Sequence, residues 1–565
     1  MLMRIFSRML LNMLIVLLFL GRLNASEHTA TGTKAMVVTE CSFATEVGVN
    51  ILKNGGNSID AAVAVAFTMA VTFPEAGNLG GGGFMVIKQA NGFSTTIDFR
   101  EKAPLRAFEE MFIDSNGKFD INLSTDGITA AGVPGSVAGL LYALEKYGTM
   151  PLSEIIDPAI QLADNGFILT PTMAAMLNRY RDSFSKYPSA KKIFVKDGSG
   201  FAAGDTLIQK NLAKTLTLIK NNGRDGFYKG EVAKLIAEQS DRDGGYISIE
   251  DLEQYKPVER KPVTGTYKEY DIISMGPTSS GGISLIQALN AIENIDLSNS
   301  MPVNEDYIFT VTEILKHVYA NRSKHLGDMD FYDVPIDYLT SKEYGKIIAS
   351  GFENYAVPSK EIKPVILPEY ESKETTHFCV LDEEGNAVSL TTTINGLFGN
   401  KVVVEGAGFF LNNEMDDFSA QPNVPNSDGL LGSVANSIQP GKRMLSSMTP
   451  TIVLKDNKPV LIVGARGGST IITTVLQIVM NVLQFDMNIQ EAIDLPRFHH
   501  QWSPDRIDYE DGLLSEDLKM KLSAKGEIIG RLRELGMATG IQVDYNKNII
   551  YGAPDKRGDG KALGY

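Results

Sequence analysis

The first part of the chain alternates apolar helical segments with glycine-rich turns. Helical spacing over residues 44–53 ends at Asn54-Gly55-Gly56. The next helix, over 60–71, is apolar on nearly every face and is expected to be buried, with Asn57 or Ser58 as its cap. The glycine-rich run 77–83 then leads into predicted strands over 84–88 and 94–100. We interpret that run as close packing of backbone beside a strand, because its spacing is not that of a phosphate loop.

The pattern changes after residue 374. Helices alternating with turns are predicted from 135 to 352, including an apolar helix that opens at Ile283. Residues 360–374 are charged, contain two prolines and show no clear period, which is typical of an exposed linker. Beyond them the sequence predicts two strand hairpins and a long apolar helix; the strands span 376–381, 387–394, 451–454 and 459–463, and the helix follows Gly467-Gly468-Ser469.

The first of these hairpins has a register that can be predicted from its turn. If the loop has three residues, Asp382 faces Asn386 and Thr393 lies opposite Thr375, with Asn395 just past the end of the ladder. Two threonines and an asparagine at one strand end suggest a polar site. Threonine is also a common strand residue, so the local pattern alone favours neither interpretation.

The N-terminus resembles a secretory signal. Two arginines within the first eight residues precede an apolar stretch over 9–20 and the small-residue sequence Leu23-Asn24-Ala25. The apolar stretch is shorter than the ~20 residues that a membrane span needs. Residues 1–25 are therefore predicted to be a signal peptide, and the mature protein to be periplasmic or secreted.

Composition and motif content argue against several classes of partner and cofactor. The 565 residues are 43% hydrophobic and carry a net charge of −15, so a nucleic-acid partner is not expected. Two cysteines, Cys41 and Cys379, are predicted to be buried and unbridged. The six histidines have no metal-ligand spacing, and the nucleotide-loop and serine-elbow motifs are absent from the sequence. Neither a metal nor a cofactor is expected.

An ordered set of motifs resembles the γ-glutamyltranspeptidase (glutathione hydrolase) family. It covers the chain from about Ala35 to Tyr565, and the order of its motifs is far more specific than any one of them. The motifs are Asn54-Gly55-Gly56-Asn57-Ser58-Ile59-Asp60-Ala61-Ala62, Asp98-Phe99-Arg100-Glu101, Thr375-Thr376-His377, Asn412-Asn413-Glu414-Met415-Asp416-Asp417-Phe418, Leu445-Ser446-Ser447-Met448, Gly467-Gly468-Ser469 and Arg497-Phe498-His499-His500.

The resemblance implies an α/β (α+β) fold, a four-layer αββα sandwich of the N-terminal-nucleophile hydrolases. It also implies that the precursor cuts itself between Glu374 and Thr375. The products would be a large subunit, 26–374, and a small subunit, 375–565, that form a heterodimer. An N-terminal threonine supplies both a hydroxyl nucleophile and an amine base of reference pKa ~7.7–8.0, so no histidine is needed.

The resemblance also assigns roles to site residues. Thr375 is the expected nucleophile, and Thr393 orients it. Gly467 and Gly468 would bind the oxyanion ahead of a helix N-terminus. The expected binding residues for the α-carboxylate of a γ-glutamyl group are Arg100, Ser446 and Ser447, and those for its α-ammonium are Asn395, Glu414 and Asp417. Asp416 is interpreted as part of a solvated turn.

The implied reaction is cleavage of glutathione and other γ-glutamyl compounds. The γ-glutamyl group would pass through a γ-glutamyl-threonine intermediate to water or to an amino acid or dipeptide acceptor. Residues 422–430 resemble a lid loop, but Ser427-Asp428 stands where many bacterial relatives have an aromatic gate. This difference suggests a wetter pocket and more hydrolysis.

Three alternatives stay open at this point. A cephalosporin or glutaryl acylase would share the nucleophile, but its donor has no ammonium and would leave Glu414 and Asp417 without a partner. A poly-γ-glutamate depolymerase would need an open groove, which the lid-like segment disfavours. An exported binding protein would leave the chain uncut.

Overall fold

The hairpin predicted after the linker forms the centre of a sheet. In the computed structural model, which describes residues 29–362, 375–421, 424, 426–427 and 429–565, β10 (Thr376–Leu381) pairs antiparallel with β11 (Ala387–Thr393). Thr376 lies opposite Thr392 and Leu381 opposite Ala387, which is the predicted register. All side chains of both strands are buried, since each face of the hairpin is covered.

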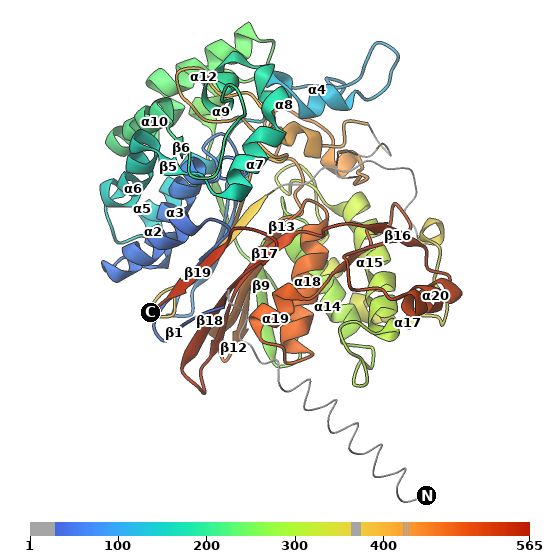
Figure 1. Ribbon diagram of the computed structural model, residues 1–565. Helices are drawn as coiled ribbons and strands as arrows, with labels where there is room; N and C mark the ends of the chain where they lie inside the picture. Colours follow the sequence, from blue (N-terminus) through green and yellow to red (C-terminus); the bar gives the residue numbers. More distant parts are fainter. Residues whose placement is uncertain (1–28, 363–374, 422–423, 425, 428) are drawn as a thin grey trace, which may run out of the picture.

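Two antiparallel seven-stranded sheets pack face to face in the described part of the chain (Figure 1). In order across the first sheet, the strands are β19 (Lys561–Gly564), β2 (Met36–Thr39), β10, β11, β3 (Gly82–Lys88), β4 (Ser94–Asp98) and β7 (Val258–Arg260). The second sheet has the order β1 (Ala30–Gly32), β18 (Ile549–Pro554), β17 (Met537–Asp544), β13 (Lys458–Arg466), β12 (Thr451–Lys455), β9 (Tyr270–Ser274) and β8 (Val263–Tyr267).

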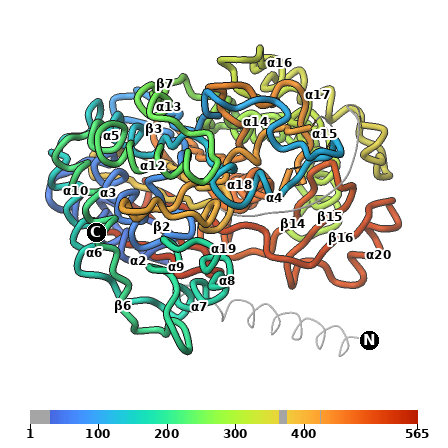
Figure 2. The backbone as a smooth tube through the Cα atoms, turned by 90° about the horizontal axis from the view of Figure 1, so that it is seen from above, coloured from blue at the N-terminus to red at the C-terminus, as the bar shows by residue number. Residues whose placement is uncertain are grey.

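Helices cover the outer face of each sheet. The first sheet is covered by α2 (Ser42–Lys53), α3 (Ser58–Thr72) and α5 (Ser136–Tyr147), with α6 (Leu152–Asn165), α10 (Lys210–Asn222) and α12 (Gly230–Arg242) nearby. The second is covered by α14 (Gly281–Ile292), α18 (Thr470–Leu483) and α19 (Ile489–Asp494), and α15 (Glu305–His325) and α17 (Lys342–Ser350) pack against α14. From above, α3, α5, α6 and α10 lie on the left of the molecule and α15 and α17 on the right (Figure 2). The predicted four-layer αββα sandwich is therefore confirmed.

Shorter elements complete the structure. They are α4 (Ile121–Thr125), α7 (Pro171–Arg179), α8 (Arg181–Ser185), α9 (Pro188–Phe194), α11 (Asp225–Tyr228), α13 (Ile249–Gln254), α16 (Ile336–Leu339), α20 (Glu516–Ala524), β5 (Phe167–Ile168), β6 (Thr206–Leu207), β14 (Phe498–His499), β15 (Ile507–Tyr509) and β16 (Ile529–Leu532). No described helix combines the length and the apolar composition needed to cross a bilayer.

Alternate side chains of the central strands point to opposite faces of the first sheet and pack in two different core clusters. In β10, Phe378 and Val380 pack in the cluster that contains α3, whereas Cys379 and Leu381 pack in the cluster between the sheets. Both faces are apolar because neither meets solvent, so the strand appears as a nearly continuous hydrophobic run. Cys379 and Cys41 are both buried and free, as predicted.

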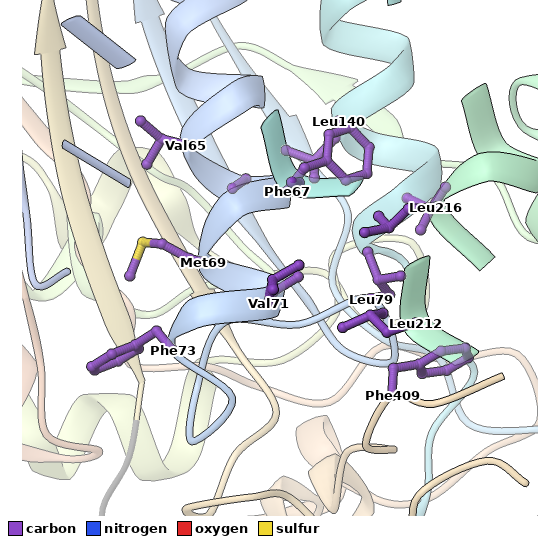
Figure 3. Close-up of a cluster of buried hydrophobic side chains, with 14 of the residues drawn as sticks. Val65, Phe67, Met69, Val71, Phe73, Leu79, Leu140, Leu212, Leu216 and Phe409 are labelled. Carbon is purple, nitrogen blue, oxygen red and sulfur yellow. The ribbon is translucent and has the colours of Figure 1, made fainter. Parts of the chain in front are cut away.

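Helix α3 supports the hairpin from outside. Its start is capped by Asn57, whose side chain accepts hydrogen bonds from the backbone N–H groups of Ile59 and Asp60, and the Asp60 carboxylate accepts one from the Asn57 backbone N–H. This capping box fulfils one of the two predicted options. Every residue of the helix is buried, and its apolar side chains meet α5, α10 and the loop of Phe409 (Figure 3).

One expectation needs correction, and two concern segments that lie wholly or mostly outside the described residues. The region 135–352 is not helical throughout, because β7, β8 and β9 lie within it. These strands are three to five residues long with mixed polarity, so period-two alternation is too brief to identify them. The signal segment 1–25 and most of the linker, 363–374, lie outside the described residues.

The glycine run 77–83 packs against neighbouring backbone, as predicted. A Cβ on Gly81 would lie 2.0 Å from the carbonyl oxygen of Thr393, and one on Gly83 would lie 2.4 Å from that of Thr391. Glycine therefore lets β3 approach β11 at the end of the strand that carries Thr393.

We predict that Gly81→Ala lowers the free energy of unfolding by about 1–3 kcal/mol, because the new methyl group must displace the Thr393 carbonyl. The measurement is the urea midpoint at unchanged slope. The matched control is Gly396→Ala, whose Cβ would have its nearest neighbour at 3.4 Å, an ordinary contact. Equal midpoints for the two variants would contradict the prediction.

Candidate active site

A small cavity opens at the ends of β10 and β11 and gathers nearly all of the candidate residues. All except Gly467 line it. The lining consists of Arg100, Thr375, Thr393, Asn395, Glu414, Asp417, Ser446, Ser447 and Gly468, joined by Arg322, Leu430, Met448 and Ile471. These residues are spread over most of the chain, so it is the fold that brings them together.

The two threonines lie at the open end of the central hairpin. Thr375 directly precedes β10, and Thr393 is the last residue of β11. The observed ladder, continued by one residue, places them opposite each other. Both are buried, and the Thr393 hydroxyl accepts a 2.7 Å hydrogen bond from the backbone of Asn395. Asn395 adopts a left-handed φ of 65°, and its side chain donates to the Asn413 carbonyl at 3.0 Å.

Arg100 lies at the centre of a buried ionic cluster just after β4. Its Nη1 is 2.6 Å from the Glu414 carboxylate, and its Nη2 donates to Asp417. A third carboxylate, that of Glu101, lies 3.6 Å from Nη1. Arg100 Nε also donates to the Met444 carbonyl at 3.3 Å. These contacts hold the guanidinium rigidly and place a cation beside acidic groups in the cavity.

Burial dominates the titration of this cluster. It raises the pKa of Glu101 to about 8 and the pKa of Glu414 well above its ordinary value, and in each case Arg100 opposes the shift. Desolvation tends to lower the pKa of Arg100, but the nearby carboxylates outweigh it and the net pKa is raised. Arg100 therefore stays charged, while Glu101 and Glu414 compete for ionisation.

Asp416 is not part of a solvated turn, and that interpretation is wrong. Its side chain is buried, accepts a 2.5 Å hydrogen bond from the Ser124 hydroxyl of α4, and accepts another at 2.9 Å from the Ser427 backbone. Burial raises the pKa of Asp416 to about 6. Its role is to connect the Asp417 segment to a distant helix, and the sequence spacing of Ser124 carries no signal of this.

The lid-like segment is described only in part. Asn426 donates to Asp417 at 3.3 Å, and Leu430 lines the cavity. Asp428, on which the expectation of a wetter pocket rests, lies outside the described residues.

Ser446 and Ser447 are held by the loop that leads into α14. Ser446 forms an isolated parallel bridge with Ser279, and the Ser280 backbone donates to the Ser446 carbonyl at 2.8 Å. The Ser447 hydroxyl lies 3.0 Å from Nη2 of Arg322. Sequence reasoning missed Arg322, and its only signal was a charged residue at an inward-facing position of the long helix α15.

The glycine pair lies between β13 and α18, as predicted. Gly467 and Gly468 have φ values of 133° and 55°, which residues with side chains rarely adopt. A Cβ on Gly467 would lie 2.5 Å from the Thr470 hydroxyl and 2.8 Å from the Gly536 Cα. The pair directly precedes the N-terminus of α18, where backbone N–H groups and the helix dipole favour negative charge.

Metal-binding side chains do not cluster in the described part of the chain: it contains no group of three or more histidine, cysteine or acidic residues arranged to hold an ion. His499 and His500 are buried, with hydrogen bonds to Gln501 and Asp505, respectively.

Comparisons with solved structures agree with this fold. A cephalosporin acylase from Bacillus halodurans matches with a TM-score of 0.86 over 96% of this chain and 98% of that one, at 24% identity, a likeness of fold alone. The γ-glutamyltranspeptidase of Helicobacter pylori is 49% identical and matches with a TM-score of 0.56 over 57% of this chain and 93% of the solved chain.

Sequence comparisons extend over almost the whole chain. The glutathione hydrolase proenzyme of Escherichia coli is 48% identical over 541 residues, 95% of this chain and 93% of the relative. That of Bacillus subtilis is 38% identical over 94% of this chain and 92% of the relative. The profile of the family described as gamma-glutamyltranspeptidase matches residues 44–565. With this match, these relatives and the αββα fold, the chain belongs to the γ-glutamyltranspeptidase family.

Proposed function

We propose that this chain is a self-processing enzyme that transfers γ-glutamyl groups from glutathione and related amides to water or to amines. The observation that carries the proposal is the composition of the cavity. Its lining combines a threonine at the start of a strand, a set of acidic side chains, a pair of serine hydroxyls and a glycine turn. These would suit, respectively, the scissile amide, the α-ammonium, the α-carboxylate and the oxyanion of a γ-glutamyl donor. The glutathione hydrolase relatives support the choice of donor.

Thr375 would act twice. In the precursor its hydroxyl attacks the carbonyl of Glu374, and the peptide bond is replaced by an ester that water hydrolyses. The released α-amine, with a reference pKa of ~7.7–8.0, then takes the proton from the same hydroxyl when that hydroxyl attacks a donor amide. Thr393, opposite Thr375 in the extended ladder, would orient the hydroxyl in both reactions.

The γ-glutamyl group has a carboxylate and an ammonium on one carbon, and in this proposal the cavity would supply partners for both. The carboxylate would meet Arg100 and the Ser446 and Ser447 hydroxyls. The ammonium would meet Asp417 and Glu414 with the Asn395 side chain. Because Glu414 is buried and Asp417 partly buried beside Arg100, an acyl group without an ammonium would leave the two acids poorly compensated.

The tetrahedral intermediate would be stabilised by the backbone N–H groups of Gly467 and Gly468. Their positive φ values support this role, because they turn the backbone between β13 and α18. One such donor typically contributes ~2.7–4 kcal/mol to lowering the barrier. The γ-glutamyl-threonine ester then passes its acyl group to water or to an amino acid or dipeptide.

The proposed cut would yield subunits 26–374 and 375–565 that stay together as a heterodimer. Strand pairing supports this, since β10 and β11 lie between β2 and β3 of the first sheet, and β12 pairs with β9 in the second. Export to the periplasm or the medium, with removal of residues 1–25, completes the proposal.

We predict that purified wild type consists of two fragments separated before Thr375, and that Thr375→Ala stays a single inactive chain. The variant has no hydroxyl for either attack. Intact mass and release of nitroaniline from a γ-glutamyl anilide are the measurements. Thr375→Ser is the matched control, since it keeps the hydroxyl and should process and turn over more slowly. An uncut wild type that releases the anilide would refute the mechanism.

We predict that Asp417→Asn lowers kcat/KM for the γ-glutamyl anilide by roughly 100-fold or more, because the neutral amide neither pairs with the ammonium nor balances Arg100. Glutaryl anilide, which has no ammonium, is the control donor and should lose much less. Wild type that prefers glutaryl anilide would instead favour the acylase alternative.

A further inference from the structure

The cavity contains a second guanidinium, that of Arg322, which has no role in the reaction proposed above. Arg322 lies near the end of α15, is buried, and lines the cavity together with Thr375. Its Nε donates to the Ser280 hydroxyl at 3.0 Å, and its Nη2 donates to the Ser447 hydroxyl at 3.0 Å. One rigid planar group therefore connects the loop before α14 with a residue of the cavity wall.

The direction of these hydrogen bonds is determined by chemistry. A guanidinium only donates, so the oxygen of Ser447 must accept from Arg322 and its own hydrogen must point elsewhere. Ser280 shows the complete pattern, since its oxygen accepts from Arg322 and its hydrogen goes to the Ser446 carbonyl at 2.6 Å. Ser447 lines the cavity, and no described residue accepts a hydrogen bond from its hydroxyl, so its hydrogen is available to a group in the cavity.

The Ser446 hydroxyl oxygen is likewise occupied by a donor of the protein. It accepts a 3.1 Å hydrogen bond from the backbone N–H of Met448. Both serine oxygens thus receive a donor from the protein, and among the described residues neither hydroxyl has an acceptor for its hydrogen, which leaves both hydrogens available to a ligand. Two such donors next to a guanidinium suit an anion, and a carboxylate has the matching pair of oxygens.

We infer that Arg322 is a positioning residue for the α-carboxylate of the γ-glutamyl donor. It keeps the Ser447 hydroxyl turned toward the cavity as a donor and adds positive charge at that end. This charge complements Arg100, whose guanidinium is shared with Glu414 and Asp417. The inference rests on the proposed function. It assigns part of the preference for donors with an α-carboxylate to a residue that acts through Ser447.

The first test compares two donors that differ only in the α-carboxylate, γ-glutamyl anilide and γ-aminobutyryl anilide. Arg322→Met should raise KM for the γ-glutamyl anilide and lower its kcat/KM by roughly 10- to 100-fold, with kcat within about threefold of wild type. Release from γ-aminobutyryl anilide, measured in single turnovers with enzyme in excess, should change by less than about threefold. Lys324→Met, which removes an exposed charge two residues away on the same helix, should behave as wild type.

A double-mutant cycle tests the path of the effect. In a Ser447→Ala background, Arg322→Met should cost far less than it does in wild type, because the hydroxyl it orients is gone. Arg322→Lys provides a second variant that keeps the charge without the planar fork, and it should give an intermediate loss. If Arg322→Met is not cleaved into two subunits, the same comparison of kcat/KM for the γ-glutamyl anilide with release from the γ-aminobutyryl anilide is made with Arg322→Lys.

Several outcomes would overturn the inference. Equal losses on both donors would mean that Arg322 has a general structural role, and additive effects with Ser447→Ala would mean that it does not act through that hydroxyl. An unchanged donor ratio in a cleaved, active variant would also refute it. By contrast, a wild type that releases no γ-glutamyl anilide would refute the proposed function itself, so the two failures are distinguishable.

Discussion

The antiparallel pairing of β10 with β11 is the constraint on which the site depends. It fixes Thr375 at the start of a central strand of a buried sheet and brings the end of β11 to the same place. A shift by one residue would exchange the two faces of β10, turning Phe378 toward the second sheet and Cys379 toward α3. Because both layers are tightly packed, side-chain packing and backbone hydrogen bonding enforce the same register. β3 pairs along the whole of β11, and glycine permits the close approach at the end of β11 that carries Thr393.

The local features that determine this arrangement could be predicted from sequence. The turn at 382–386 predicts the register, the helix cap at Asn57 follows from residue type, and Gly467-Gly468 before an apolar run predicts the start of α18. The remainder depends on contacts between distant residues. Asp416 is buried because Ser124, nearly 300 residues earlier, reaches it, and Arg322 enters the cavity because α15 packs beside α14. A single sequence contains no local pattern for such pairings.

The ionic cluster around Arg100 shows how a binding cavity differs from an ordinary core. One buried cation faces the carboxyl groups of Glu101, Glu414 and Asp417, and burial keeps the pKa of Glu101 and of Glu414 raised. A buried cluster of one cation and several carboxyl groups stabilises a fold less than an apolar core of equal volume would. An ammonium group brought beside these acids would favour their ionised forms, so in the proposed function the excess of acidic groups would complement the ammonium of the donor.

The interleaving of strands has a thermodynamic consequence. The β10–β11 hairpin is flanked by β2 on one side and β3 on the other, so both strands next to the hairpin come from before the proposed cut. In the uncut chain, unfolding is unimolecular. Once the chain is cut, unfolding releases two polypeptides that gain independent translational freedom, and the apparent stability comes to depend on protein concentration. At low protein concentration the cut form would therefore unfold more readily than the uncut precursor, even if the two folded forms made identical contacts.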